Sequence, residues 1–186
     1  MKYKIERNTV QETLILPLYS RKLCSELYPN LYRDETAVRL IDQIDYDFSV
    51  AEKNSRSLMQ RFGALEVAMR QCDLAWEVRD YLKTHPCAAV FFASGVFYYF
   101  LTQQVRELVQ GMADAFPGGV LVFDAANRTA VKMIAKTWLK TAKIKDVGAY
   151  FAVSDAKSEL SPWDSRLQVS SRGYMLGYND LKDPSV

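Results

Sequence analysis

Residues 88–124, AAVFFASGVFYYFLTQQVRELVQGMADAFPGGVLVFD, contain the pattern that decides the fold. The continuous apolar runs Ala88–Ala93 and Val120–Phe123 are typical of strands that are buried on both faces of a parallel sheet. Between them, the pattern predicts a helix from a Thr102 cap to Phe116, and Pro117–Gly119 predicts a turn before the second strand. Strand, helix and strand in this order predict an α/β fold.

The remaining segments extend this pattern towards both ends of the chain. A helix is expected over Arg128–Ala142 and a third strand over Ala149–Val153. Alternating residues at 166–170 and the segment Tyr174–Tyr178 predict a closing antiparallel hairpin. Residues 1–85 are predicted to be helical, with the last helix ending at His85-Pro86. Along that helix, apolar residues at steps of three and four predict one buried face: Leu58, Phe62, Leu65, Met69, Cys72 and Trp76.

The composition excludes several classes of protein. With 186 residues, 49% hydrophobic and 25% charged, the chain has the balance of a folded globular domain rather than a disordered one. Lys and Arg total 24 against 22 Asp and Glu, so the net charge of +2 gives no argument for a nucleic-acid or membrane partner. The longest apolar run, Ala88–Leu101, is too short to span a bilayer.

The cysteines and the first residues predict a cytoplasmic protein. Cys24, Cys72 and Cys87 are odd in number and far apart, which is typical of reduced thiols and not of a disulfide framework or a zinc site. No apolar segment follows Met1–Lys4, so we expect no secretory signal.

The single histidine, His85, limits the chemistry that the chain can carry. It excludes a metal site built on several histidines, and a Ser–His–acid hydrolase would also need a G-x-S-x-G motif, which is absent. We therefore expect His85 to be a connecting residue and predict no metal site. No nucleotide-binding turn is visible either, because no two of the eight glycines form G-x-G and no G-K-[ST] follows any of them.

Arg70 is the only cation on a helix face that otherwise carries Glu66, Asp73, Glu77 and Asp80. One interpretation is ion pairing with acids one turn away, which is worth only tenths of a kcal/mol. The other is a guanidinium group directed at the carboxylate of a ligand. Sequence spacing does not decide between the two.

A second charged face follows the predicted second strand. Its residues could bind an anion or a nucleic acid, or they could form a solvated helix face, and the nearly balanced net charge favours the solvated face. They are Arg128, Lys132, Lys136 and Lys140, with Lys143 and Lys145 beyond them.

Small and acidic residues follow the two predicted strands of the 88–124 segment. In parallel α/β sheets, ligands bind at the carboxyl ends of the strands. Ser94-Gly95 would let a ligand approach the backbone there, or would form a tight turn. Asp124 occupies the equivalent place after the next strand, where it could instead cap a helix that begins near Ala126.

Seven segments, each weakly specific alone, occur in the order and spacing of one enzyme family and run along nearly the whole chain. Together they resemble the leucine carboxyl methyltransferase family, in its bacterial branch of polyketide-type (tetracenomycin-like) O-methyltransferases, which use S-adenosylmethionine. The segments are TLILPLYSR at 13–21, YRDETAV at 32–38, AMRQ at 68–71, WEVRDYL at 76–82, SGVFYY at 94–99, QVREL at 104–108 and FPGGVLVFD at 116–124.

This resemblance implies a set of residues that bind the methyl donor. Arg70 matches the family arginine that grips the donor carboxylate, and Ser94, Gly95 and Tyr99 match the segment that lines the donor and acceptor pocket. Where the family usually has an acid before the glycine, this chain has Ser94, so a carboxylate contact to the donor is not expected at this position.

The resemblance also implies a domain organisation. It predicts an N-terminal helical cap over residues 1–85 and a Rossmann-like methyltransferase core over residues 86–186, closed by the C-terminal hairpin. Tyr19 and Arg21 lie in the predicted cap, which in the family helps to cover the substrate.

One departure from the family pattern is large. The first strand of the family runs into a G-x-G turn and two further strand–helix units, one of which carries the acid that holds the ribose. Here Val90 is followed at once by Phe91, which matches the fourth strand. A missing segment of the sequence, a natural or engineered deletion, and a misplaced strand alignment remain open explanations. We favour the first, because a deleted half-sheet would leave a raw strand edge, and we place the seam between residues 90 and 91.

The function implied by the resemblance is S-adenosylmethionine-dependent transfer of a methyl group to a carboxylate or hydroxyl of a small molecule or peptide. A carboxylate acceptor is already ionised at neutral pH and needs no general base, whereas an alcohol or phenol needs one, for which no catalytic residue can be assigned. The alternative is an inactive remnant of such an enzyme that acts as a binding or scaffold protein. The sequence does not indicate an oligomeric state.

Overall fold

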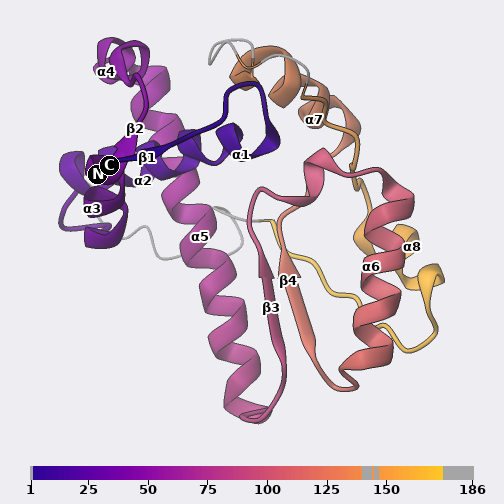
Figure 1. Cartoon of the computed structure of the whole chain (residues 1–186). Coiled ribbons are helices and arrows are strands. Elements are labelled where there is room, and N and C mark those ends of the chain that lie inside the picture. Colours follow the sequence, from indigo (N-terminus) through magenta and orange to yellow (C-terminus); the bar gives the residue numbers. More distant parts are fainter. Residues whose placement is uncertain (1, 140–143, 145–146, 174–186) are drawn as a thin grey trace. The chain divides into compact units, whose positions relative to one another are not determined.

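The computed structural model describes residues 2–139, 144 and 147–173 (Figure 1). The described chain forms two compact units, each of which is built from two stretches of sequence. Unit 1 contains residues up to Ala68 together with those of Lys132–Ala149, and unit 2 contains Met69–Val131 and the described residues from Tyr150 onward. The fold is mixed α/β and mostly helical, with two small parallel sheets.

Unit 2 contains the strand–helix–strand unit that residues 88–124 predict. Strands β3 (Val90–Ala93) and β4 (Val120–Phe123) pair in parallel, and helix α6 (Thr102–Ala115) joins them. The pairing aligns Val90 with Val120 and continues to Ala93 opposite Phe123. Thr102 is the first residue of α6, so the predicted Thr102 cap is wrong. Leu101 occupies the N-cap position, and its N–H donates to Gln104 Oε1 at 2.8 Å.

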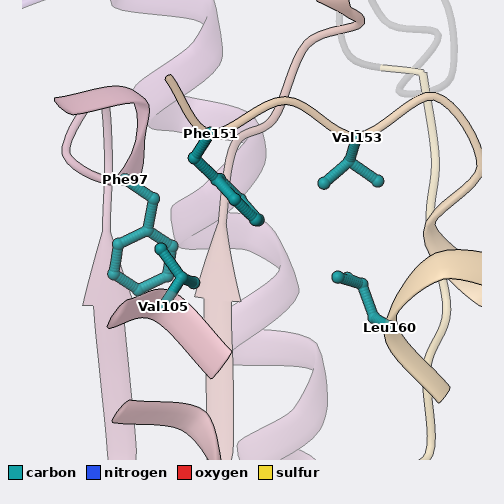
Figure 2. Packing of buried hydrophobic residues seen from close by; sticks show 5 residues of the cluster. All are labelled: Phe97, Val105, Phe151, Val153 and Leu160. Atoms are coloured by element: carbon teal, nitrogen blue, oxygen red, sulfur yellow. The ribbon is translucent and has the colours of Figure 1, made fainter. Parts of the chain in front are cut away.

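The core of unit 2 lies on the α6 side of this small sheet (Figure 2). Phe97 and Val105 pack there with a later segment of the chain, and Phe151 is only 1% exposed. The Phe97 and Phe123 ring centroids are 5.0 Å apart, and the Phe151 ring lies 6.2 Å from each of them. Short helical elements complete the unit: η1 (Phe97–Tyr99), the start of α7 (Arg128–Ile134), α8 (Ala156–Leu160) and η3 (Ser161–Trp163).

Unit 1 is largely helical. Within the predicted helical region lie α1 (Val10–Thr13), α2 (Ile15–Leu27), α3 (Glu35–Gln43) and α4 (Ser49–Asn54), and Asp34 caps α3 by accepting the Ala37 N–H at 2.8 Å. The sequence pattern did not indicate a parallel pair of two-residue strands, β1 (Tyr3–Lys4) and β2 (Ile44–Asp45). A π-helical stretch, Ala135–Leu139, follows α7.

Helix α5 (Leu58–Thr84) ends before His85 as predicted, but of the six residues of its predicted buried face only Leu65 is buried. Leu58 is 83% and Phe62 57% exposed, while Ala64 and Leu74 are buried. The helix contributes its first residues to unit 1 and those from Met69 onward to unit 2. A single apolar face is expected of a helix that packs on one core, and α5 contributes to two.

Two strand predictions are wrong. Residues 149–153 and 166–170 form no strand, and the rest of the predicted hairpin, Tyr174–Tyr178, lies outside the described residues. Phe151 and Val153 nevertheless belong to the hydrophobic core, and Val169 packs against it. The sheet is also not buried on both faces, because side chains alternate along a strand and Phe92 is 46% exposed. No helix among the described residues is both long and apolar enough to cross a membrane.

Candidate functional site

The carboxylate of Asp124, at the end of β4, organises a polar cluster within unit 2. Its side chain is 1% exposed and accepts three hydrogen bonds. Oδ1 accepts the Gly95 N–H at 2.5 Å, and Oδ2 accepts the Tyr98 hydroxyl at 2.8 Å and Arg70 Nη1 at 3.2 Å. Burial of a carboxylate is costly unless it is paired and hydrogen-bonded, and here both conditions are met.

The parallel strands explain why these residues meet. The carboxyl ends of β3 and β4 lie at the same edge of the sheet, so the Ser94-Gly95 turn after β3 comes beside Asp124. Gly95 has φ +68°, in the left-handed region that glycine adopts at little cost. A Cβ at this position would lie 3.4 Å from Arg70 Nη2, which places the turn directly beside the guanidinium group.

Tyr98 is fixed at both ends. Its ring is buried in η1 and its hydroxyl donates to Asp124, while its backbone carbonyl accepts the Tyr150 N–H at 2.7 Å and the Phe151 N–H at 3.3 Å. The extended segment that begins at Tyr150 therefore supports the turn after β3 from the side of the hydrophobic core.

Arg70, from α5, is the partly open member of the cluster. Its side chain is 17% exposed, and only Nη1 contacts Asp124. Its Nε is buried and has no hydrogen-bond acceptor among the described residues. An unsatisfied buried donor costs about 1–3 kcal/mol, so this atom calls for an explanation, such as a ligand oxygen or a water.

A cavity of about 1380 Å³ adjoins the cluster within unit 2. Arg70 and Asp124 line it together with Asp73 and Glu77 of α5, and residues 166–173 lie along another side. Ligand pockets usually measure about 300–1,000 Å³, so this space is large enough for a cofactor-sized molecule. Asp124 already opposes the charge of Arg70, so an anion bound here would rely on the guanidinium donors that Asp124 does not use.

The structure brings Arg70 and Gly95 together, and Ser94 directly precedes that glycine. Tyr99 also lies in η1, but Tyr98, which the sequence reasoning missed, is the tyrosine that contacts Asp124. Their roles in binding a methyl donor remain predictions.

The idea that Asp124 caps a helix is wrong. Asn127 Oδ1 accepts the Ala130 N–H at 2.9 Å at the start of α7, and Asp124 is engaged by Gly95, Tyr98 and Arg70 instead. Its place after a parallel strand was the signal that could have identified it as the centre of the cluster.

Tyr19 and Arg21 lie on α2, in unit 1. Arg21 forms an ion pair with Asp34, and Tyr19 stacks on Phe48 with the ring centroids 5.3 Å apart. Burial raises the pKa of Tyr19, as do the nearby carboxylates Glu52 and Glu26. Their predicted contact with a substrate stays a prediction.

Two other candidates from the sequence are surface features. His85 is exposed, as expected of a connecting residue at a helix end. Its ring stacks on that of Tyr81, with the ring centroids 4.2 Å apart. On the basic face, Arg128, Lys132 and Lys136 are exposed, and Lys140, Lys143 and Lys145 lie outside the described residues. Within the described part of the chain, no three His, Cys, Asp or Glu side chains are grouped to hold a metal ion.

Comparison with known proteins finds no matching family model, no matching curated protein and no matching solved structure.

Proposed function

We propose that the protein is an S-adenosylmethionine-dependent O-methyltransferase that acts on a carboxylate or hydroxyl of a small molecule or peptide. The observation that supports this proposal is that Arg70 lies next to the Gly95 turn, at the carboxyl ends of two parallel strands. Both residues were assigned to the donor site from resemblance alone, although they lie on different elements. A Rossmann-like methyltransferase core belongs to the same proposal.

The residues fit one end of the donor. The buried Nε of Arg70 needs an acceptor, and a carboxylate at this position would supply one. The nucleoside end has no comparable partner, because the sequence has no G-x-G turn and the described residues include no further strand of this sheet beside β3 and β4. The fit is therefore to a carboxylate ligand, and the nucleoside contacts depend on the predicted seam at residues 90 and 91.

The chain's own groups would act mainly by binding and positioning. When bound, the donor supplies a methyl group on a sulfonium, and its transfer is an in-line displacement that is accelerated by alignment of the two reactants and exclusion of water. Arg70 would neutralise the donor carboxylate and Asp124 would hold Arg70 in place. An acidic acceptor is favoured, because it needs no proton removal at neutral pH.

A second candidate function is a binding or scaffold protein derived from such an enzyme. It is favoured by the continuity of β3, in which Val90 and Phe91 are consecutive residues paired with Val120 and Leu121. If no segment belongs between them, the glycine turn and the ribose acid are absent and methyl transfer should not occur.

Titration calorimetry with S-adenosylmethionine tests the proposal, on a sample whose intact mass has been compared with the sequence. Micromolar binding supports the enzyme, and no binding at millimolar donor supports the remnant. Arg70→Ala should weaken donor binding by about 1.5–3 kcal/mol, as expected for a hydrogen bond to a charged group. Arg79→Ala is the matched control, because Arg79 is an exposed cation on the same helix. An unchanged affinity in the Arg70 variant would refute its assigned role.

A further inference from the structure

Among the described residues, Arg70 is held through one of its three nitrogens, Nη1. Asp124 Oδ2 accepts from Nη1 at 3.2 Å, which leaves Nε and Nη2 as the two donors along one edge of the guanidinium group. Nε is buried without an acceptor among the described residues, and Nη2 lies beside Gly95. Two adjacent N–H groups on one edge of an arginine match the two oxygens of a carboxylate.

Asp124 is anchored independently of Arg70. The Gly95 N–H and the Tyr98 hydroxyl both donate to it, and Tyr98 is itself held by backbone bonds from Tyr150 and Phe151. The carboxylate is thus a fixed point at the end of β4, whereas the Arg70 side chain has several rotatable bonds. The rigid partner sets the position of the flexible one.

We propose that Asp124 is a positioning residue that orients Arg70, so that its Nε and Nη2 present a two-donor fork to the carboxylate of a ligand. The inference rests on the proposed function and assigns Asp124 a role that acts only through Arg70. Gly95 contributes through its backbone, because its N–H donates to Asp124 Oδ1 and its position places the turn beside Nη2.

The opposite role for Asp124 makes the opposite prediction. A carboxylate beside Arg70 could compete with an anionic ligand, and its removal would then tighten binding. The geometry favours positioning, because Asp124 uses a single Arg70 donor and already accepts two other hydrogen bonds. The sign of the change in affinity decides between the two roles.

The experiment measures the binding of two probes to the full chain. S-adenosylhomocysteine carries the amino-acid carboxylate, and methylthioadenosine lacks it but keeps the nucleoside. Asp124→Asn should weaken S-adenosylhomocysteine binding about tenfold to a hundredfold and leave methylthioadenosine binding within about twofold, as expected for the loss of one charged hydrogen bond. Asp80→Asn, which removes a partly exposed carboxylate from α5, should change neither affinity.

A double variant shows whether Asp124 acts through Arg70. Adding Asp124→Asn to Arg70→Gln should cause no further loss of S-adenosylhomocysteine affinity, because the group that Asp124 positions is already gone. Equal weakening of both probes by Asp124→Asn, additive losses, or tighter binding would overturn the inference.

A measurement without ligand keeps this test separate from the proposed function. Failure of the unaltered protein to bind either probe at millimolar concentration would overturn the proposed function. Asp124 would then be judged by the Arg70 Nε–H resonance of isotope-labelled protein, identified by its absence in Arg70→Lys. We expect slow exchange with solvent in the unaltered protein and in Asp80→Asn, and fast exchange in Asp124→Asn. Slow exchange in all three proteins would refute the positioning role.

Discussion

Replacement of Phe151 by alanine tests how the core of unit 2 is built. The Phe151 side chain is 1% exposed and packs with Phe97 in the core (Figure 2). Its ring centroid lies 6.2 Å from those of Phe97, Phe123 and Trp163. Truncation of a buried phenylalanine typically costs about 3–5 kcal/mol, because transfer free energy is lost and a cavity remains. With three aromatic neighbours around this site, we expect a loss of about 4 kcal/mol, in the middle of this range.

The assay is urea unfolding of the full chain followed by circular dichroism, with the neighbouring residue as the control. Tyr150 is 57% exposed, and the bond that it gives to Tyr98 comes from its backbone N–H, which Tyr150→Ala retains. Surface substitutions of this kind usually change the free energy of unfolding by less than about 0.5 kcal/mol. A contrast of several kcal/mol between adjacent positions is therefore expected.

The contrast between the two variants tests what holds residues 149–153 in place, because these residues form no strand. Within the described part of the chain, their backbone gives only isolated hydrogen bonds to Tyr98 and Ala126, so we expect side-chain packing to hold the segment in place. A loss below about 1 kcal/mol for Phe151→Ala, or equal losses for the two variants, would show that this reasoning is wrong.

Two further predictions concern unit 1. Burial alone would raise the pKa of Asp34, but hydrogen bonds from the Ala37 N–H and from Arg21 outweigh burial and lower that pKa. The ionised carboxylate therefore stabilises the fold at pH values above the ordinary pKa of 3.8, and this contribution is lost as the pH falls below 3.8. Asp34→Ala should cost about 1–2 kcal/mol at neutral pH and flatten the acid side of the stability profile in urea unfolding; a profile as steep as that of the unaltered protein would contradict this. Burial and, to a smaller extent, the hydrogen bond to Glu12 raise the pKa of Tyr46 from 10.0 to about 12. As the pH rises, this tyrosine therefore ionises first in the unfolded chain, and the free energy of unfolding falls between pH 10 and pH 12. Thermal unfolding of Tyr46→Phe should show a smaller fall over that interval, and an identical fall would exclude Tyr46 as its source.

The strand–helix–strand unit could be predicted because its signals are local. An apolar run, an amphipathic helix and a Pro-Gly-Gly turn lie within 37 consecutive residues, 88–124, and each matches one element of the structure. The third strand could not be predicted in the same way. Residues 149–153 have the composition of a strand, but a strand also requires a ladder partner, and β4 pairs only with β3 among the described residues.

The candidate site divides along the same line. The place of Arg70 on a helix face and of Ser94-Gly95 after a strand could be read from local patterns and from resemblance. The choice of Tyr98 over Tyr99 could not, because it depends on which side of the short η1 turn faces β4. Arg70 likewise pairs with an acid that is 54 residues away in the sequence. The spacing of charges along its own helix could not identify that partner.

The energetics of the Arg70–Asp124 pair argue for a binding role over a purely structural one. Breaking a buried ion pair is costly, but such a pair is often no more stabilising than apolar residues of similar volume, because both charges lose their hydration. Here the arginine also carries a buried Nε with no acceptor in the described chain, which costs about 1–3 kcal/mol. A pair selected only for stability would be expected to satisfy that atom. A guanidinium group held by Asp124 at Nη1, with an Nε that has no acceptor in the described chain, beside a glycine turn at the carboxyl ends of two parallel strands, is the arrangement expected if Arg70 binds an anion as proposed.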